Sequence, residues 1–294
     1  MQARATLQVE GYFDPATGTL SYIVLDTSTR HCALIDSVRD HDPKSGRTAH
    51  SGADRLIARV RALDASVQWI LETHVHADHL SDAPYLQQQL GGRLGIGEHI
   101  TAVHAAFCTL FNDSASFPSD GRHFDHLFTD GEIFSIGSLR ARALHTPGHT
   151  PACMTYAVSD DFEAVAFVGD TLFMPDCGTA RCDFPGGDAR MLFRSISKLL
   201  GMQPTTQLYM CHDYPPEGRD VQFISSVGEQ LETNIHVRQG ISEADFVSMR
   251  LARDATLEMP ALILPAVQVN LRGGALPEPE ANGVRYIKIP IDAF

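Results

Sequence analysis

The sequence predicts a mixed α/β (α+β) fold in which short buried strands alternate with amphipathic helices. Short apolar or β-branched runs recur along most of the chain, and segments with apolar residues at helical spacing lie between them. Polar clusters rich in histidine and aspartate follow four of the predicted strands, directly after Leu71, Leu144, Val168 and Cys211. Because strand ends can converge on one edge of stacked sheets, we expect these clusters to form a common site.

The amino-terminal part is predicted to contain strands first. Residues 20–25 and 32–35 are apolar or β-branched, and a turn-like segment separates them. Residues 37–50 are polar and contain proline and glycine, which predicts a loop. Ser51 is predicted to be the N-cap of a helix, because apolar residues at helical spacing follow it. Residues 67–71 are apolar and favour a buried strand that runs into the first polar cluster.

The same alternation continues to the carboxy terminus. A helix is expected over residues 100–110, and Asp188 is predicted to cap another helix that stops at Gly201. Ser242 begins a sequence that resembles a capping box, and the tail after Pro260 is expected to be irregular. The remaining strands are expected at residues 133–136, 139–144, 153–158, 164–168 and 208–211.

Composition excludes several classes of function. The formal net charge is −13 and no basic run is present, which argues against binding to nucleic acid. No stretch is long and apolar enough for a transmembrane helix, and the first residues do not resemble a secretory signal. The six cysteines are scattered rather than arranged as a disulfide framework. We therefore expect reduced thiols, a cytoplasmic location and no membrane partner.

The polar clusters contain side chains of the types that bind transition metals. Seven candidates stand in or after predicted strand ends: His74, His76, Asp78, His79, His149, Asp170 and His212. The first four form a His-x-His-x-Asp-His cluster, which cannot lie on one face of a helix and fits a tight loop around a point. Imidazole and carboxylate groups suit zinc, iron or manganese. The complete set therefore predicts a metal site.

This ordered series resembles the metallo-β-lactamase superfamily over residues 12–227. The resemblance is carried by THVHADH at 73–79, TPGHT at 146–150, GDTLF at 169–173 and the later His212. It implies a four-layer αββα sandwich with the site on one edge of the paired sheets. In this interpretation residues 1–235 form the catalytic domain, and residues 236–294 are a carboxy-terminal extension packed on the same domain.

Three further segments look like those of the persulfide dioxygenases, also called sulfur dioxygenases. They are FDPATGTLSYIVLD at 13–26, CGTARCDFPGG at 177–187 and HDY at 212–214. This resemblance implies one Fe(II) per chain and the oxidation of glutathione persulfide, with O₂ and water, to sulfite and glutathione. Family members often pair, so a homodimer is expected.

The resemblance also assigns roles to residues. His74, His149 and Asp170 would bind the iron on one face and leave the opposite face open to the substrate sulfur and O₂. The side chains that would orient these ligands are His76, Asp78, His79 and His212. Glutathione would be bound by Arg181 and Tyr214. The chain departs from the human-type members just before Arg181, where Thr179-Ala180 looks like a two-residue insertion.

Other interpretations of the same residues stay open. A glyoxalase II-type hydrolase would use two metals, one bound by His74, His76 and His149, the other by Asp78, His79 and His212, with Asp170 bridging. A non-catalytic module stabilised by metal would need closed coordination, and seven candidates exceed that need. Arg181 could instead form a structural ion pair with Asp183, and Tyr214 could be a packed loop aromatic.

Overall fold

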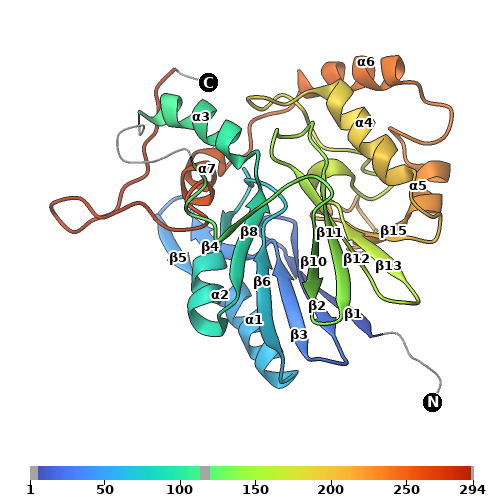
Figure 1. Cartoon of the computed structure of the whole chain (residues 1–294). Coiled ribbons are helices and arrows are strands. Elements are labelled where there is room, and N and C mark those ends of the chain that lie inside the picture. The colour runs from blue at the N-terminus through green and yellow to red at the C-terminus, as the bar shows by residue number, and fades with distance from the viewer. Residues whose placement is uncertain (1–5, 113–119, 293–294) are drawn as a thin grey trace.

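Two six-stranded sheets pack face to face, and helices cover the outer face of each (Figure 1). The computed structural model describes residues 6–112 and 120–292. The four layers confirm the predicted αββα sandwich. Among the described residues, no helix combines the length and the apolar character needed to cross a bilayer.

The first sheet has the strand order β1-β2-β3-β6-β8-β9. β1, β2 and β3 pair antiparallel, whereas β3, β6, β8 and β9 pair parallel. The strand bounds are β1 (Leu7–Asp14), β2 (Thr19–Asp26), β3 (His31–Ile35), β6 (Ser66–Leu71), β8 (Arg93–Gly97) and β9 (His126–Phe128). The parallel strands bring the chain after β6 and the start of β2 to the same edge of the molecule.

The second sheet has the order β10-β11-β12-β13-β14-β15. All of its neighbours are antiparallel except β13 and β14, which are parallel. The strand bounds are β10 (Ile133–Ile136), β11 (Leu139–His145), β12 (Met154–Ser159), β13 (Ala164–Phe167), β14 (Gln207–Tyr209) and β15 (Ile224–Ser226). The ends of β11, β13 and β14 therefore come out at one edge, as the polar clusters predicted.

Helices bury an apolar stripe against each sheet. The first sheet is covered by α1 (Ser51–Ala62), α2 (Ala83–Leu90) and α3 (Ile100–Phe111), and the second by α4 (Ala189–Leu200), α5 (Val227–Thr233) and α6 (Glu243–Asp254). Between the sheets lies a separate core of large side chains that includes Tyr22, Trp69, Phe128, Tyr156 and Phe167. The predicted caps of α4 and α6 are confirmed, because Asp188 accepts a hydrogen bond from Met191 N and Ser242 accepts one from Asp245 N.

The prediction of a loop over residues 37–50 was wrong. β4 (Val38–Asp42) and β5 (Arg47–Ala49) form a hairpin, which joins β7 (Leu80–Ser81) in a small third sheet. The hairpin lies largely at the surface, so its residues are polar and show no apolar alternation. Ser51 is not an N-cap either. Helix α1 already begins at Ser51, whose backbone N–H and hydroxyl both donate to Asp40.

The tail after Pro260 is less irregular than expected, because it contains α7 (Ile263–Asn270). This helix is buried around most of its circumference, so its sequence lacks the polar face by which surface helices are recognised. Pro265 lies in the first turn, where a missing backbone N–H costs nothing. The helix packs on Leu80 through Ala266 and Val269, directly beside the first histidine cluster.

Candidate metal centre

The ends of both sheets are joined where the histidine clusters lie. Thr19, at the start of β2, pairs with His212, which follows β14 in the other sheet. Two backbone hydrogen bonds flank this pair: Leu20 N donates to Cys211 O at 2.7 Å and Asp213 N to Gly18 O at 3.1 Å. Each loop that follows β6, β11, β13 or β14 therefore contributes side chains to one shared region.

His74, His149 and Asp170 form a compact buried group. One ligand atom of each lies within 4.8 Å of the other two. Asp170 Oδ2 lies 3.8 Å from His74 Nε2 and 3.6 Å from His149 Nε2. The three residues come from three different strand ends, so the fold rather than local sequence brings them together. This is the set that the sequence predicted as the iron ligands.

Each imidazole of this group has a partner for the nitrogen that faces away from Asp170. His149 Nδ1 lies 2.8 Å from the carbonyl oxygen of Arg181, and His74 Nδ1 lies 3.0 Å from the Thr73 hydroxyl. A carbonyl can only accept, so His149 carries its proton on Nδ1 and presents the lone pair of Nε2. His74 Nε2 is buried, and no group of the described residues forms a hydrogen bond with it. An orphaned imidazole nitrogen beside a carboxylate fits a bound cation.

Burial favours the neutral form of two histidines of the centre, His74 and His76. It lowers the pKa of His74 and of His76 well below the ordinary value, and the neighbouring imidazoles add to this effect. Neutral imidazole is the form that binds metal ions.

Two glycines make the group possible. Gly148 and Gly169 immediately precede His149 and Asp170, and both have positive φ angles, 141° and 52°. A Cβ on Gly148 would lie 2.3 Å from the Leu192 backbone, and one on Gly169 would lie 2.8 Å from the Thr73 hydroxyl oxygen. No other residue type fits at either position without moving its neighbour.

The remaining candidates lie next to this group and interact mostly with one another. Thr19 Oγ1 lies 3.3 Å from His79 Nδ1 and 3.4 Å from His212 Nδ1. His212 Nε2 lies 3.2 Å from Asp170 Oδ1 and 3.5 Å from Asp78 Oδ2. Although burial opposes ionisation, the His212 and His79 rings hold the pKa of Asp78 well below its usual range. This set, His76, Asp78, His79 and His212, is called the second group below.

His76 is oriented by two buried carboxylates that the sequence analysis did not single out. Its Nε2 lies 3.1 Å from Asp36 Oδ1 and 3.6 Å from Glu72 Oε2. Burial first, and then the charge of Asp36, raises the pKa of Glu72 well above its ordinary value. Asp36 follows the predicted strand at 32–35 directly, which is the same feature that drew attention to the later clusters.

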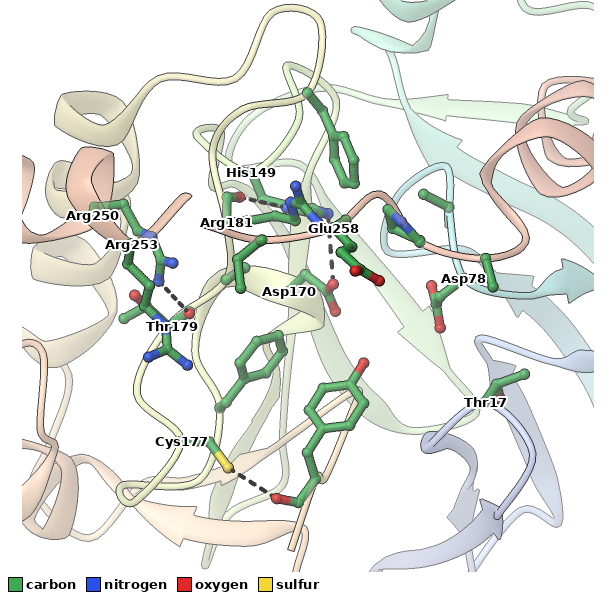
Figure 2. A pocket seen from close by; sticks show the side chains of 18 of the residues that line it. Thr17, Asp78, His149, Asp170, Cys177, Thr179, Arg181, Arg250, Arg253 and Glu258 are labelled. Carbon is green, nitrogen blue, oxygen red and sulfur yellow. Dashed lines mark hydrogen bonds and ion pairs between the residues drawn. The ribbon is translucent and has the colours of Figure 1, made fainter. Parts of the chain in front are cut away.

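A cavity of about 680 Å³ opens onto the centre (Figure 2). His149, Asp170 and Asp78 contribute to its lining, so the cavity reaches two members of the compact group. Residues after Asp170 and residues from the carboxy-terminal segment form its walls, including Arg253 and Glu258. The extension beyond residue 235 thus helps to enclose the site.

The two predicted substrate residues both line this cavity. Tyr214 is 52% exposed, and its ring stacks on His212 with the planes 11° apart. The guanidinium of Arg181 is already engaged, because Nε and Nη2 each donate to an Asp183 oxygen at 2.6 Å. Nη1 donates to Glu258 O. The ion pair with Asp183, one of the two interpretations of the sequence, is therefore present.

The fold and the centre agree with a family match. Residues 15–212 match the model of the metallo-beta-lactamase superfamily. The chain belongs to the metallo-beta-lactamase superfamily. The matched region of this superfamily member contains all seven predicted ligand-type residues and ends at His212.

Proteins similar to this superfamily member are named as different kinds of enzyme. A probable metallo-hydrolase of Burkholderia pseudomallei is 61% identical, over 98% of this chain and all of that protein. Glyoxylase B2 of Dictyostelium discoideum is 46% identical over 99% of each. The mitochondrial persulfide dioxygenase ETHE1 of Homo sapiens is 26% identical over 92% of this chain and 90% of that protein. Among solved structures, ETHE1 from Myxococcus xanthus matches with a TM-score of 0.71 and 27% identity, over 91% of this chain and all of that one.

Proposed function

We propose that this chain is a glutathione persulfide dioxygenase with one Fe(II) per chain, bound by His74, His149 and Asp170. Glutathione persulfide, O₂ and water would give sulfite and glutathione, with the outer sulfur oxidised and O₂ reduced. The compact group of these three residues at the end of an open cavity carries the proposal. The likeness to ETHE1 of Homo sapiens and of Myxococcus xanthus, over nine-tenths of the chain, supports it.

The donor set suits this chemistry. Two imidazoles and one carboxylate on one side of an iron leave open positions for a sulfur ligand and O₂. Bound Fe(II) would supply the redox chemistry by which O₂ oxidises the persulfide. The protein's own part is positional: Thr73 and the Arg181 carbonyl fix the ring orientation of His74 and His149. The buried setting of these rings limits access of water from the side away from the cavity.

The cavity also suits a small charged peptide. Its volume lies within the range of about 300–1,000 Å³ that is usual for small-molecule sites. Glutathione carries two carboxylates and one ammonium group, and the cavity wall offers exposed groups of both signs in Arg253 and Glu258. No ion pair of Arg253 is found within residues 6–112 and 120–292, so its guanidinium is available to a carboxylate. Arg181 would have to exchange Asp183 for substrate, and Tyr214 offers an exposed ring.

A dinuclear thioester hydrolase of the glyoxalase II type is the second candidate. Among the residues that the structure describes, buried His76 Nδ1 and His79 Nε2 have no hydrogen-bond partner, as expected if His76 completes the first metal site and His79 binds a second ion. The names of the Burkholderia and Dictyostelium relatives support hydrolysis as well. Such a site would use metal-bound hydroxide to attack the thioester carbonyl.

A paired assay separates the two candidates. The metal-free protein would be loaded anaerobically with Fe(II) or with Zn(II), and bound metal would be counted by mass spectrometry. We expect one iron per chain, and O₂ uptake with sulfite formation only when glutathione persulfide is present. Hydrolysis of S-lactoylglutathione by a protein that carries two zinc ions, without O₂ uptake in the iron form, would contradict the dioxygenase proposal.

The proposed setting of the enzyme is the cytoplasm, as a homodimer. Cys32, Cys153, Cys177, Cys182 and Cys211 are free thiols, which suits a reducing compartment. Light scattering on the purified protein tests the pairing, and a monomer at micromolar concentration would contradict it.

A further inference from the structure

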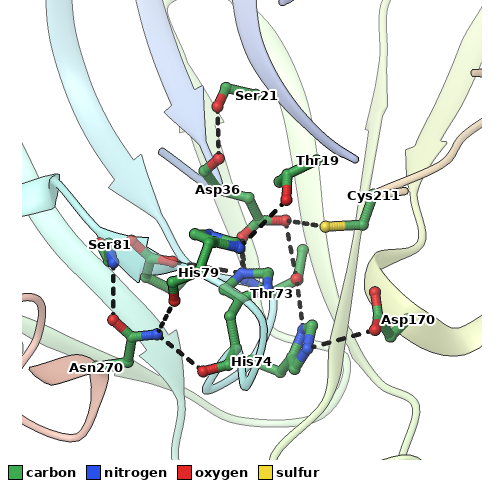
Figure 3. A network of polar contacts seen from close by, with 12 residues as sticks. Thr19, Ser21, Asp36, Thr73, His74, His79, Ser81, Asp170, Cys211 and Asn270 are labelled. Carbon is green, nitrogen blue, oxygen red and sulfur yellow. Dashed lines mark hydrogen bonds and ion pairs between the residues drawn. The ribbon is translucent and has the colours of Figure 1, made fainter. Parts of the chain in front are cut away.

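We infer that Asn270, at the end of α7, is a positioning residue that holds the first histidine cluster in its metal-binding conformation. Its side-chain amide donates to His76 O at 2.9 Å and to His79 O at 2.8 Å. Its oxygen accepts a hydrogen bond from Ser81 N at 2.8 Å. Figure 3 shows these bonds reaching from the helix to the loop.

An amide suits this place better than any other side chain. Asn270 uses both of its donors and its acceptor on backbone groups, and it is only 5% exposed. The two carbonyls require donors and the Ser81 N–H requires an acceptor, so the orientation of the amide is fixed. A carboxylate of the same shape would face two carbonyl oxygens without a proton to share.

The hydrogen bonds of Asn270 hold the loop that carries the first metal-binding histidines. His76 and His79 belong to the same short loop as His74, and that loop has no helix or strand of its own between β6 and β7. Two hydrogen bonds from one buried side chain therefore restrain the backbone of this loop, and a third fixes the side chain to Ser81 in β7. α7 is itself anchored beside the loop by the packing of Ala266 and Val269 on Leu80.

The carboxy-terminal segment also acts on the other side of the centre. Arg250 of α6 donates to Thr179 O at 3.0 Å, and Asp254 accepts from Cys182 N at 2.9 Å. These bonds hold the chain on both sides of Arg181, whose carbonyl orients His149. Residues beyond the superfamily match at 15–212 thus position both histidines of the compact group. This role does not depend on which reaction the centre performs.

The test compares two amides on one helix. Asn270→Asp and Asn270→Ala remove the donors to the loop. Gln268→Glu and Gln268→Ala are matched controls, because Gln268 is also buried (4% exposed) but its amide bonds Leu264 O and Lys288 O instead. Metal-free proteins would be titrated with Co²⁺ in competition with a chelator, and the visible spectrum of the cobalt form and the melting temperature would be recorded.

We expect the Co²⁺ dissociation constant to rise at least about tenfold in both Asn270 variants, because loss of an outer partner of a metal site typically costs about 10–100-fold. Their cobalt spectra should also change. The Gln268 variants should melt at a lower temperature, but their Co²⁺ dissociation constant and cobalt spectrum should equal those of the wild-type protein. Equal metal affinity in the Asn270 variants, or an equal loss in the Gln268 variants, would overturn the inference.

A second measurement uses the wild-type protein, so its result does not depend on whether the variants fold. Because coupling between two sites is reciprocal, metal binding must order the contacts of Asn270 if those contacts favour metal binding. We expect Co²⁺ to slow amide hydrogen exchange at Ser81 and in α7. Exchange in the last turn of α1, which precedes the start of β6 at the opposite edge of the first sheet, should stay unchanged. Unchanged exchange at Ser81 on metal addition would count against the role of Asn270.

Discussion

Two groups of metal-binding side chains lie side by side in this protein, and they differ in how they are held. In the compact group, protein atoms occupy the Nδ1 side of His74 and His149, so that both Nε2 atoms face Asp170. In the second group, one residue serves several partners: His76 takes part in three different clusters of ligand atoms. Because one imidazole nitrogen binds one ion, His76 can serve as a metal ligand in only one of these three clusters at a time. The difference favours a single well-defined metal position and makes the occupancy of the second group the decisive question.

Loss of Asp170 should have the largest effect. Asp170→Ala removes the carboxylate that faces both histidines of the compact group, so we expect the metal to be lost and turnover to fall by more than about 100-fold, the upper end for loss of an outer partner. Metal analysis and a turnover assay measure both effects. Asp176→Ala is the matched control, because Asp176 lines the same cavity but pairs with Arg219. Full metal content in Asp170→Ala would exclude this group as the site.

Loss of His79 distinguishes one metal from two. With a single ion in the compact group, His79→Asn should keep one metal per chain and reduce turnover about tenfold, because His79 only supports its neighbours. With two ions, the same variant should lose half of the metal and nearly all thioester hydrolysis. Metal stoichiometry by mass spectrometry gives the answer directly, and it does not depend on the substrate.

The cavity arginines should give a smaller effect that is confined to substrate binding. Arg253→Ala should raise KM about tenfold and leave kcat nearly unchanged, since it removes a charge-assisted hydrogen bond of about 1.5 kcal/mol or more from the bound substrate. Arg181→Ala should raise KM as well if Arg181 leaves Asp183 for the substrate. Steady-state kinetics on both variants compares them. If KM stays unchanged in one variant, that arginine does not bind the substrate.

A surface ion pair far from both groups should matter least. Arg59 donates two hydrogen bonds to Glu10, and these lower the pKa of Glu10 below its ordinary value of 4.5. Because the folded pKa is the lower one, this stabilisation is present above about pH 4.5 and is lost as the pH falls through the lowered value. Arg59→Ala should lower the melting temperature only slightly at neutral pH, because exposed ion pairs contribute little, and the unfolding curves of both proteins should converge in acid. Metal content should not change.

The sequence predicted those residues of the centre whose position can be inferred from the strand that precedes them. His74, His149 and Asp170 each lie in the loop that follows a buried apolar strand, and that rule is enough to place them on one edge. Asn270 follows no such rule, since its partner His76 lies 194 residues away and only the packing of α7 brings them together. The hairpin of β4 and β5 was missed because a polar surface strand has no apolar alternation. For Arg181, the sequence allowed both an ion pair with Asp183 and substrate binding, and the folded structure contains the ion pair.

The separation of His74, His149 and Asp170 along the chain has a consequence for folding. An ion held by residues at positions 74, 149 and 170 would tie together three points of the chain that are free to move apart once it unfolds. Like a disulfide, it would close long loops whose entropy the unfolded chain otherwise keeps. Metal supply would then govern how long the protein survives in the cell as well as how fast it works.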